Sequence, residues 1–148
     1  MENARSSVAD LIAESLLPGR EERVRALFNA EGLRAPEVVW SPGDVELTNP
    51  LHRQFAEICA ARMQNGRLAD DALTVDDLGS LSDWLMVVEV EGGGDDFRYV
   101  HYGRIIAEYS GLDLSGRMTS EFQSGFKYLS IFFTGLYKAV VSSGQWVC

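Results

Sequence analysis

Residues 84–102, WLMVVEVEGGGDDFRYVHY, decide the fold of this 148-residue chain. The apolar run from Trp84 to Val90 is rich in β-branched and aromatic residues, which favour strands. It is followed by Gly92-Gly93-Gly94, which can take the positive φ angles of a tight turn. From Phe97 onward, aromatic rings recur at every second or third position. The stretch therefore predicts an antiparallel β-hairpin.

The pattern changes to a helical period after the hairpin. Ile105, Ile106 and Tyr109 fall on one side of a short helix. Gly111 stands where a helix end favours a residue that can adopt left-handed backbone angles. A longer helix is predicted over residues 125–143. Its apolar residues form a stripe so wide that this face must be buried.

This order of elements resembles the PAS family of sensor domains, in the variant found near the N-terminus of many alphaproteobacterial signalling proteins. The resemblance is carried by Asp96-Phe97-Arg98-Tyr99, by Tyr102-Gly103 and by residues 111–117, GLDLSGR, with residues 65–68 and 78–81 in the lead-in. It implies an α+β fold, in which a PAS-like antiparallel sheet has helices packed on one face and is preceded by an N-terminal helical region.

The resemblance also implies strands beyond the long helix. A PAS domain closes a five-stranded sheet with three strands that follow this helix, whereas residues 145–148 supply at most the start of the first. A two-stranded hairpin alone is marginally stable. We therefore expect the sequence to be part of a longer polypeptide, with the remaining strands and an output domain after Cys148.

Three segments organise the chain. Residues 1–47 form an N-terminal helical extension, residues 48–83 hold a lead-in helix and an acidic loop, and residues 84–148 are the N-terminal part of the PAS-like domain. The lead-in helix is predicted to begin at Asn49, whose side chain can cap it, because Pro50 follows. Two amphipathic helices in the extension have two interpretations: a cap over the core of the same chain, or a dimerisation element.

Composition limits the possible partners. A hydrophobic fraction of 46% is enough for a packed core, and the net charge of −9 disfavours nucleic acid and anionic membrane surfaces. No apolar run approaches the roughly 20 residues that span a bilayer, and no signal peptide is recognisable. We therefore expect a cytoplasmic location. Cys59 and Cys148 are isolated thiols, and without a secretion signal they are expected to be reduced.

The sequence contains no pattern of an active site or a metal site. It has no nucleophile elbow, phosphate loop or dinucleotide fingerprint. His52 and His101 stand alone, and no Cys-x-x-Cys occurs. The acidic residues around Asp70 and Asp76 lack the alternate spacing of a calcium loop, so a solvated loop is predicted there. We expect neither catalytic nor metal-binding residues.

The resemblance also bears on cofactors. Flavin-binding PAS domains carry a reactive cysteine on the helix after Gly-Arg, and haem-binding ones a histidine on the long helix. This chain has neither, which disfavours a flavin adduct and His-ligated haem and leaves the cofactor unknown. The predicted ligand-binding residues lie between helix and sheet: Tyr102, Phe122, Phe126, Tyr128, Phe132, Phe133 and Tyr137. The alternative is that these aromatic rings simply fill the core.

The resulting expectation is a cytoplasmic sensory or regulatory module. It would bind a small apolar or aromatic ligand or a partner, and form a homodimer. It would control an output domain by changing between two arrangements that bind the ligand with different affinity. The alternative is an interaction module that dimerises without a ligand. An enzyme acting on a small molecule ranks below both.

Overall fold

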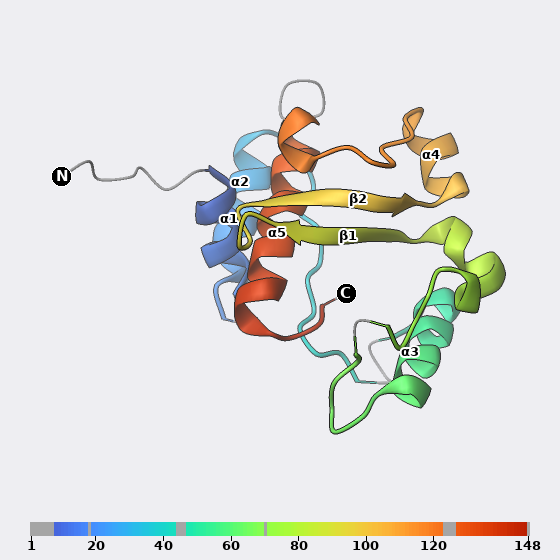
Figure 1. The fold of residues 1–148 in the computed structure, drawn as a ribbon. Helices are drawn as coiled ribbons and strands as arrows, with labels where there is room; N and C mark the ends of the chain where they lie inside the picture. The colour runs from blue at the N-terminus through green and yellow to red at the C-terminus, as the bar shows by residue number, and fades with distance from the viewer. Residues whose placement is uncertain (1–7, 18, 44–46, 70, 123–126, 148) are drawn as a thin grey trace. The chain divides into compact units, whose positions relative to one another are not determined.

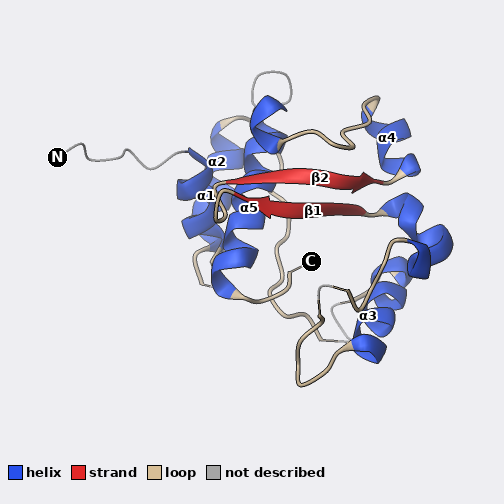
Figure 2. Cartoon of the chain, in the orientation of Figure 1, coloured by secondary structure: helices blue, strands red, loops and turns tan. Residues whose placement is uncertain are grey.

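The computed structural model describes residues 8–17, 19–43, 47–69, 71–122 and 127–147. Within these ranges the fold mixes helices with a two-stranded antiparallel sheet, which confirms the predicted α+β class (Figures 1 and 2). The strands are β1 (Met86–Glu91) and β2 (Asp96–Tyr102). The helices are α1 (Val8–Leu16), α2 (Glu21–Ala30), α3 (Pro50–Arg62), η1 (Asp76–Trp84), α4 (Arg104–Ser110), η2 (Thr119–Phe122) and α5 (Lys127–Ser143).

The predicted hairpin is confirmed. Gly92, Gly93 and Gly94 have φ angles of 58°, 73° and 106°, as the turn between β1 and β2 requires. The amide of Gly94 donates to the carbonyl of Glu91 at 3.0 Å and closes the turn. The three glycines thus reverse the chain where residues with a Cβ would be strained.

The chain returns to β2 after α4. Gly111 ends α4 with a φ of 73°, the left-handed cap that the sequence predicted. Further on, the amide of Gly116 donates to the carbonyl of Tyr99 at 2.6 Å, and the amide of Tyr99 donates to the carbonyl of Arg117 at 3.0 Å. This segment therefore satisfies backbone groups of β2 that the hairpin does not use.

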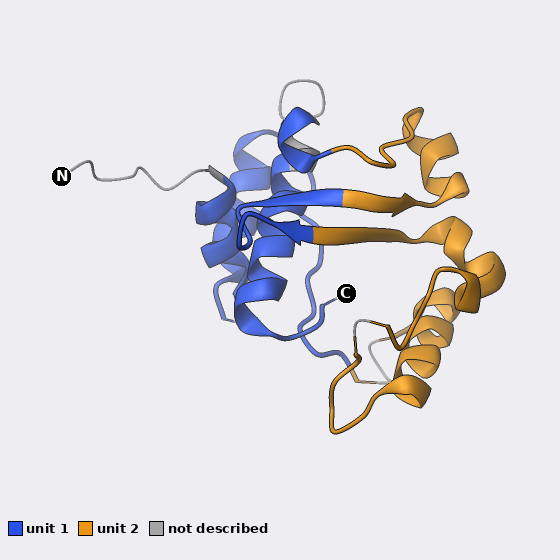
Figure 3. Cartoon of the chain, in the orientation of Figure 1, with its two compact units in different colours: residues 1–42, 90–98, 118–148 blue, residues 43–89, 99–117 orange. Residues whose placement is uncertain are grey.

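The chain forms two compact units, each built from segments that are distant in sequence (Figure 3). Unit 1 contains residues 1–42, 90–98 and 118–148. Unit 2 contains residues 43–89 and 99–117.

Unit 1 is built on the packing of α1 against α5, which lie side by side (Figure 1). Ile12 and Leu16 of α1 share a buried core with Phe132 and Ala139 of α5. Gly135 allows the close approach, because a Cβ built there would lie 2.6 Å from Cγ2 of Ile12. The inner face of α1 therefore covers the core of its own chain. This agrees with the interpretation of the N-terminal helices as a cap over that core.

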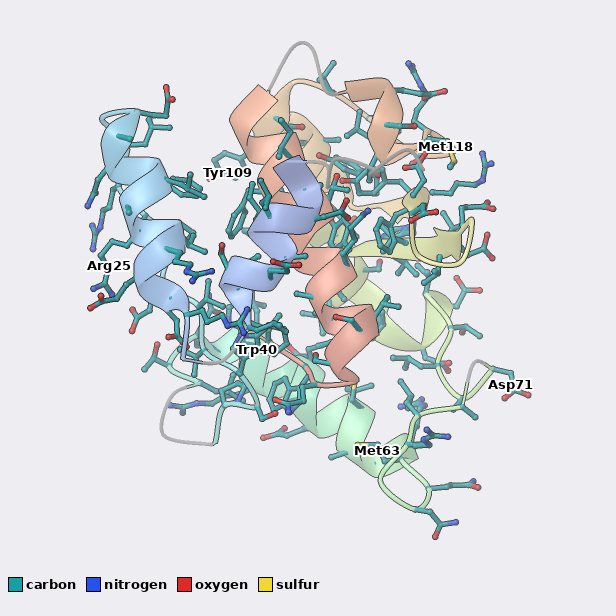
Figure 4. The ribbon with its side chains drawn as sticks, turned by 90° about the vertical axis from the view of Figure 1, so that its left-hand side faces the viewer. Arg25, Trp40, Met63, Asp71, Tyr109 and Met118 are labelled. Carbon is teal, nitrogen blue, oxygen red and sulfur yellow. The ribbon has the colours of Figure 1, made fainter. Side chains whose placement is uncertain are left out.

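Trp40 connects the segment after α2 to two other parts of unit 1. Its indole nitrogen donates to the carbonyl of Leu16 at 2.6 Å, and Figure 4 shows the side chain close to the end of α1. Trp40 also forms an isolated antiparallel bridge with Val147, and the amide of Ser41 donates to the carbonyl of Trp146 at 2.8 Å. The sequence predicted the start of a strand after the long helix. Within residues 145–147 the structure shows a single β-bridge there.

Unit 2 contains the lead-in helix α3 and the 3-10 helix η1. Asn49 caps α3 as predicted, because its side-chain oxygen accepts from the amide of Leu51 at 2.9 Å. The apolar face of α3 is only half-buried, however, and no residue of this helix is fully buried. The acidic segment predicted to be a loop is helical over Asp76–Trp84 except at Gly79, whose φ of 53° and ψ of −132° break the helix. Leu78 and Leu81 are buried in it.

No helix in the described part of the chain has both the length and the apolar composition needed to cross a membrane.

Candidate functional site

Three of the predicted ligand-binding residues come together on α5. Phe132 is buried, whereas Phe133 and Tyr137 are half-buried. The ring centroids of Phe132 and Phe133 lie 5.7 Å apart, and the rings of Phe133 and Tyr137 stack at 6.2 Å with an interplanar angle of 26°. These separations are typical of favourable aromatic pairs.

The row of rings continues at both ends within unit 1. Phe28 of α2 meets Phe132 edge-to-face at 5.4 Å. Phe97 of β2 meets Tyr137 at 5.4 Å with an interplanar angle of 65°, and the side chain of Phe97 is 0% exposed. The five rings thus run from α2 across α5 to the hairpin, and each described ring of the predicted site has another ring as a neighbour.

The remaining predicted residues lie elsewhere or cannot be described. Tyr102 belongs to unit 2, where its ring packs edge-to-face against Tyr99 at 5.4 Å. Phe126 and the side chains of Phe122 and Tyr128 lie outside the described residues. The description of the candidate site therefore rests on Phe132, Phe133 and Tyr137 of α5 and on Phe97 of β2.

Asp96 fixes the start of β2 next to η2. Its Oδ1 atom accepts hydrogen bonds from the hydroxyl of Thr119 at 2.7 Å and from the amides of Phe97 and Ser120 at 2.9 and 3.2 Å. Its Oδ2 atom accepts from the hydroxyl of Ser120 at 2.5 Å. Burial raises the pKa of Asp96, but these bonds, led by the Ser120 hydroxyl, lower the pKa overall. The carboxylate therefore holds β2 and η2 together as an anion.

The predicted ligand-binding residues did not include Phe97, Asp96 and Gly135, three residues that build this region. Phe97 could have been found, because it alternates with Tyr99 on one face of the strand. Asp96 belongs to the motif that carries the resemblance, but nothing local to it or to Gly135 indicated their contacts, since their partners Thr119 and Ile12 are distant in sequence. Only the folded chain brings these groups together.

The described residues offer little for metal or thiol chemistry. No group of three or more His, Cys, Asp or Glu side chains in these ranges is arranged to hold a metal ion. Burial raises the pKa of the Cys59 thiol, with only a partial opposing effect of Arg62, which favours the protonated and unreactive form.

No family model, curated protein or solved structure matches this chain.

Proposed function

We propose that this chain is a non-catalytic, cytoplasmic regulatory module with a PAS-like architecture. In this proposal it binds a small apolar or aromatic ligand, or a protein partner, and transmits the bound state to an output domain. A switch of this kind requires a ligand that binds two arrangements of the module with different affinity.

The contact between Phe97 and Tyr137 is the observation that supports the proposal best. A PAS-like module needs its first hairpin to pack an apolar side chain against the long helix that follows. Phe97 is fully buried and meets the ring of Tyr137. The order of elements also agrees, because the hairpin is followed by α4 with its Gly111 cap, by η2 and then by α5.

A ligand would bind over the rings that the chain leaves partly open. Phe133 and Tyr137 are half-buried, as is Phe28 at the α2 end of the row, whereas Phe132 and Phe97 are buried. An apolar or aromatic ligand that covered the rings of Phe133 and Tyr137 would remove apolar surface from water, which is the main favourable contribution in most small-molecule sites. This surface is the part of the row that can respond to a ligand.

Native mass spectrometry of the purified chain tests the proposal. We expect a small molecule that is retained under native conditions and released on denaturation. Phe133→Leu should lower its occupancy, because the ring stacked on Tyr137 is lost while the apolar volume is largely kept. Leu27→Ala is a matched control on an exposed position of α2. A chain that carries no ligand, or equal occupancy in both variants, would contradict binding at these rings.

A second candidate function is homodimerisation without a ligand. Leu11 of α1 and Leu27 of α2 are each about half exposed, although the inner face of α1 is covered by α5. These leucines could bury further apolar surface in a second copy. Light scattering of Leu11→Asp, compared with Ala26→Asp on another exposed position, tests this function. Loss of a dimer in Leu11→Asp alone supports it, and a monomeric parent chain rejects it.

A further inference from the structure

A groove of about 560 Å³ lies beside α4 in unit 2 and is separate from the aromatic row of unit 1. Its apolar lining comes from Tyr102, Ala107 and Leu112. Its polar lining comes from Asp83, His101, Arg104, Glu108 and Asp113. The volume is in the range of small-molecule sites, and the lining combines apolar surface with a few polar groups, as such sites do.

The guanidinium of Arg104 is already paired on both sides. One terminal nitrogen donates to Oε1 of Glu108 at 2.7 Å, and the other donates to Oδ2 of Asp83 at 3.2 Å. The hydrogen bonds that Arg104 donates to Glu108 and then to Asp83 raise the pKa of Arg104. Its positive charge is thus held by two carboxylates, which makes Arg104 a poor receptor for an anion.

Asp113 adds a carboxylate with an open oxygen. Its Oδ1 atom accepts from the hydroxyl of Ser115 at 2.7 Å and from the amide of Ser115 at 2.9 Å. The hydroxyl bond and then the amide bond lower the pKa of Asp113, so the group is ionised at neutral pH. Within the described residues Oδ2 receives no hydrogen bond, which leaves it as an acceptor.

His101 adds a further acceptor. Its Nε2 atom lies 2.8 Å from the carbonyl oxygen of Ser82, which cannot donate, so Nε2 carries the proton of this hydrogen bond. In the neutral ring Nδ1 is then an acceptor. The three carboxylates and the single guanidinium of the groove leave two negative charges.

We propose that this groove binds a small organic amine, whose ammonium group faces Asp113 and whose apolar or aromatic body packs on Tyr102 and Leu112. The excess of carboxylates favours a cation, and the face of a tyrosine ring attracts one as well. A divalent metal ion is less suited, because no three His, Cys, Asp or Glu side chains among the described residues are arranged to hold one. This site does not depend on the function proposed above.

Three probes that share a phenyl ring separate charge from shape: phenethylamine, 2-phenylethanol and phenylacetate. Each is titrated into the full chain at neutral pH while amide resonances are followed by two-dimensional NMR. We expect saturable shifts over residues 101–113 with phenethylamine, weaker binding of 2-phenylethanol and no binding of phenylacetate. An absence of saturable shifts with the amine, or equal binding of the alcohol or the acid, would overturn the proposal.

A conservative variant tests the role of Asp113. Asp113→Asn keeps the side-chain oxygen that accepts from Ser115, and so keeps the turn, but removes the charge. We expect the dissociation constant for phenethylamine to rise by up to about fivefold, the upper end of the range for one exposed charge pair. Glu31→Gln removes an equal charge from unit 1 and should leave binding unchanged. Equal effects of the two variants, or none for Asp113→Asn, would contradict the site.

Discussion

The ring of Phe97 on β2 meets the ring of Tyr137 on α5 at 5.4 Å and 65°, and this contact joins residues 40 positions apart within unit 1. The side chain of Phe97 is fully buried, so no part of this ring is in contact with water. Tyr137 is half-buried and stacks on Phe133 as well. Tyr137 therefore links β2 to the row of rings on α5.

A double-mutant cycle measures this contact. Phe97→Leu and Tyr137→Leu should each lower the free energy of unfolding, and their effects should fall short of additivity by about 0.5–1.5 kcal/mol, the range for aromatic pairs. Phe97→Ala should be more severe, at about 3–5 kcal/mol. Urea unfolding followed by circular dichroism gives these values. Strict additivity of the two leucine variants would show that the rings do not interact.

Gly135 permits a prediction in which two effects oppose each other. Gly135→Ala gains roughly 1 kcal/mol of helix propensity. The new methyl group would, however, lie 2.6 Å from Cγ2 of Ile12 and 3.0 Å from the carbonyl oxygen of Ala9. Overpacking of this kind costs about 1–3 kcal/mol, so we expect a net loss of unfolding free energy. In an Ile12→Ala background the same change should be milder, and an equal loss in both backgrounds would exclude Ile12 as the cause.

The signals that predicted the fold correctly are local ones. Gly92 to Gly94 determine the hairpin turn, Gly111 ends α4, and Asn49 with Pro50 begins α3, because each acts on backbone angles or amides within a few residues. The helical period also sorted the rings of α5 onto faces. The stripe was predicted to be buried as a whole, but of its described rings only Phe132 is fully buried, whereas Phe133 and Tyr137 are half-buried.

The unpredicted part of the structure consists of long-range contacts. Trp40 pairs with Val147, Asp96 binds Thr119, and α1 packs closely on α5 at Gly135. Each depends on two segments that only tertiary packing brings together, so a period or a cap within one segment cannot reveal it. Tyr109, at 86% exposed, shows the same limit: its spacing with Ile105 indicated a shared helix face but not burial.

Two glycines of unit 2 allow sterics and backbone strain to be compared. Gly103 has ordinary angles, but an added Cβ would lie 2.6 Å from the carbonyl carbon of Asp83 and 2.8 Å from the carbonyl oxygen of Leu85, both backbone atoms. Gly111 has open space but a φ of 73°. Gly111→Ala should cost roughly 1–2 kcal/mol, the penalty of left-handed angles. Gly103→Ala should cost about 3 kcal/mol, because backbone cannot move aside as a flexible side chain can. Urea midpoints in the reverse order would contradict the close contact at Gly103.

Asp96 gives the chain a specific sensitivity to acid. Its pKa is lowered in the folded state, where bonds from Ser120 and Thr119 outweigh the effect of burial. The folded state therefore binds fewer protons at this group than the unfolded state, and stability must fall as the pH drops. The contribution is complete above the unfolded pKa of about 3.9 and is lost as the pH falls through the lower pKa of the folded state.

Asp96→Asn tests this dependence. At neutral pH we expect a loss of about 1–3 kcal/mol of unfolding free energy, since hydrogen bonds to a charged acceptor are lost or weakened. The difference from the parent chain should shrink when urea unfolding is repeated near pH 3, below the unfolded pKa of about 3.9, because the parent carboxylate is then being protonated. Asp95→Asn removes the charge of the exposed neighbouring residue and is the matched control. A difference that stays constant between the two pH values would mean that Asp96 stabilises β2 and η2 by its shape and not by its charge.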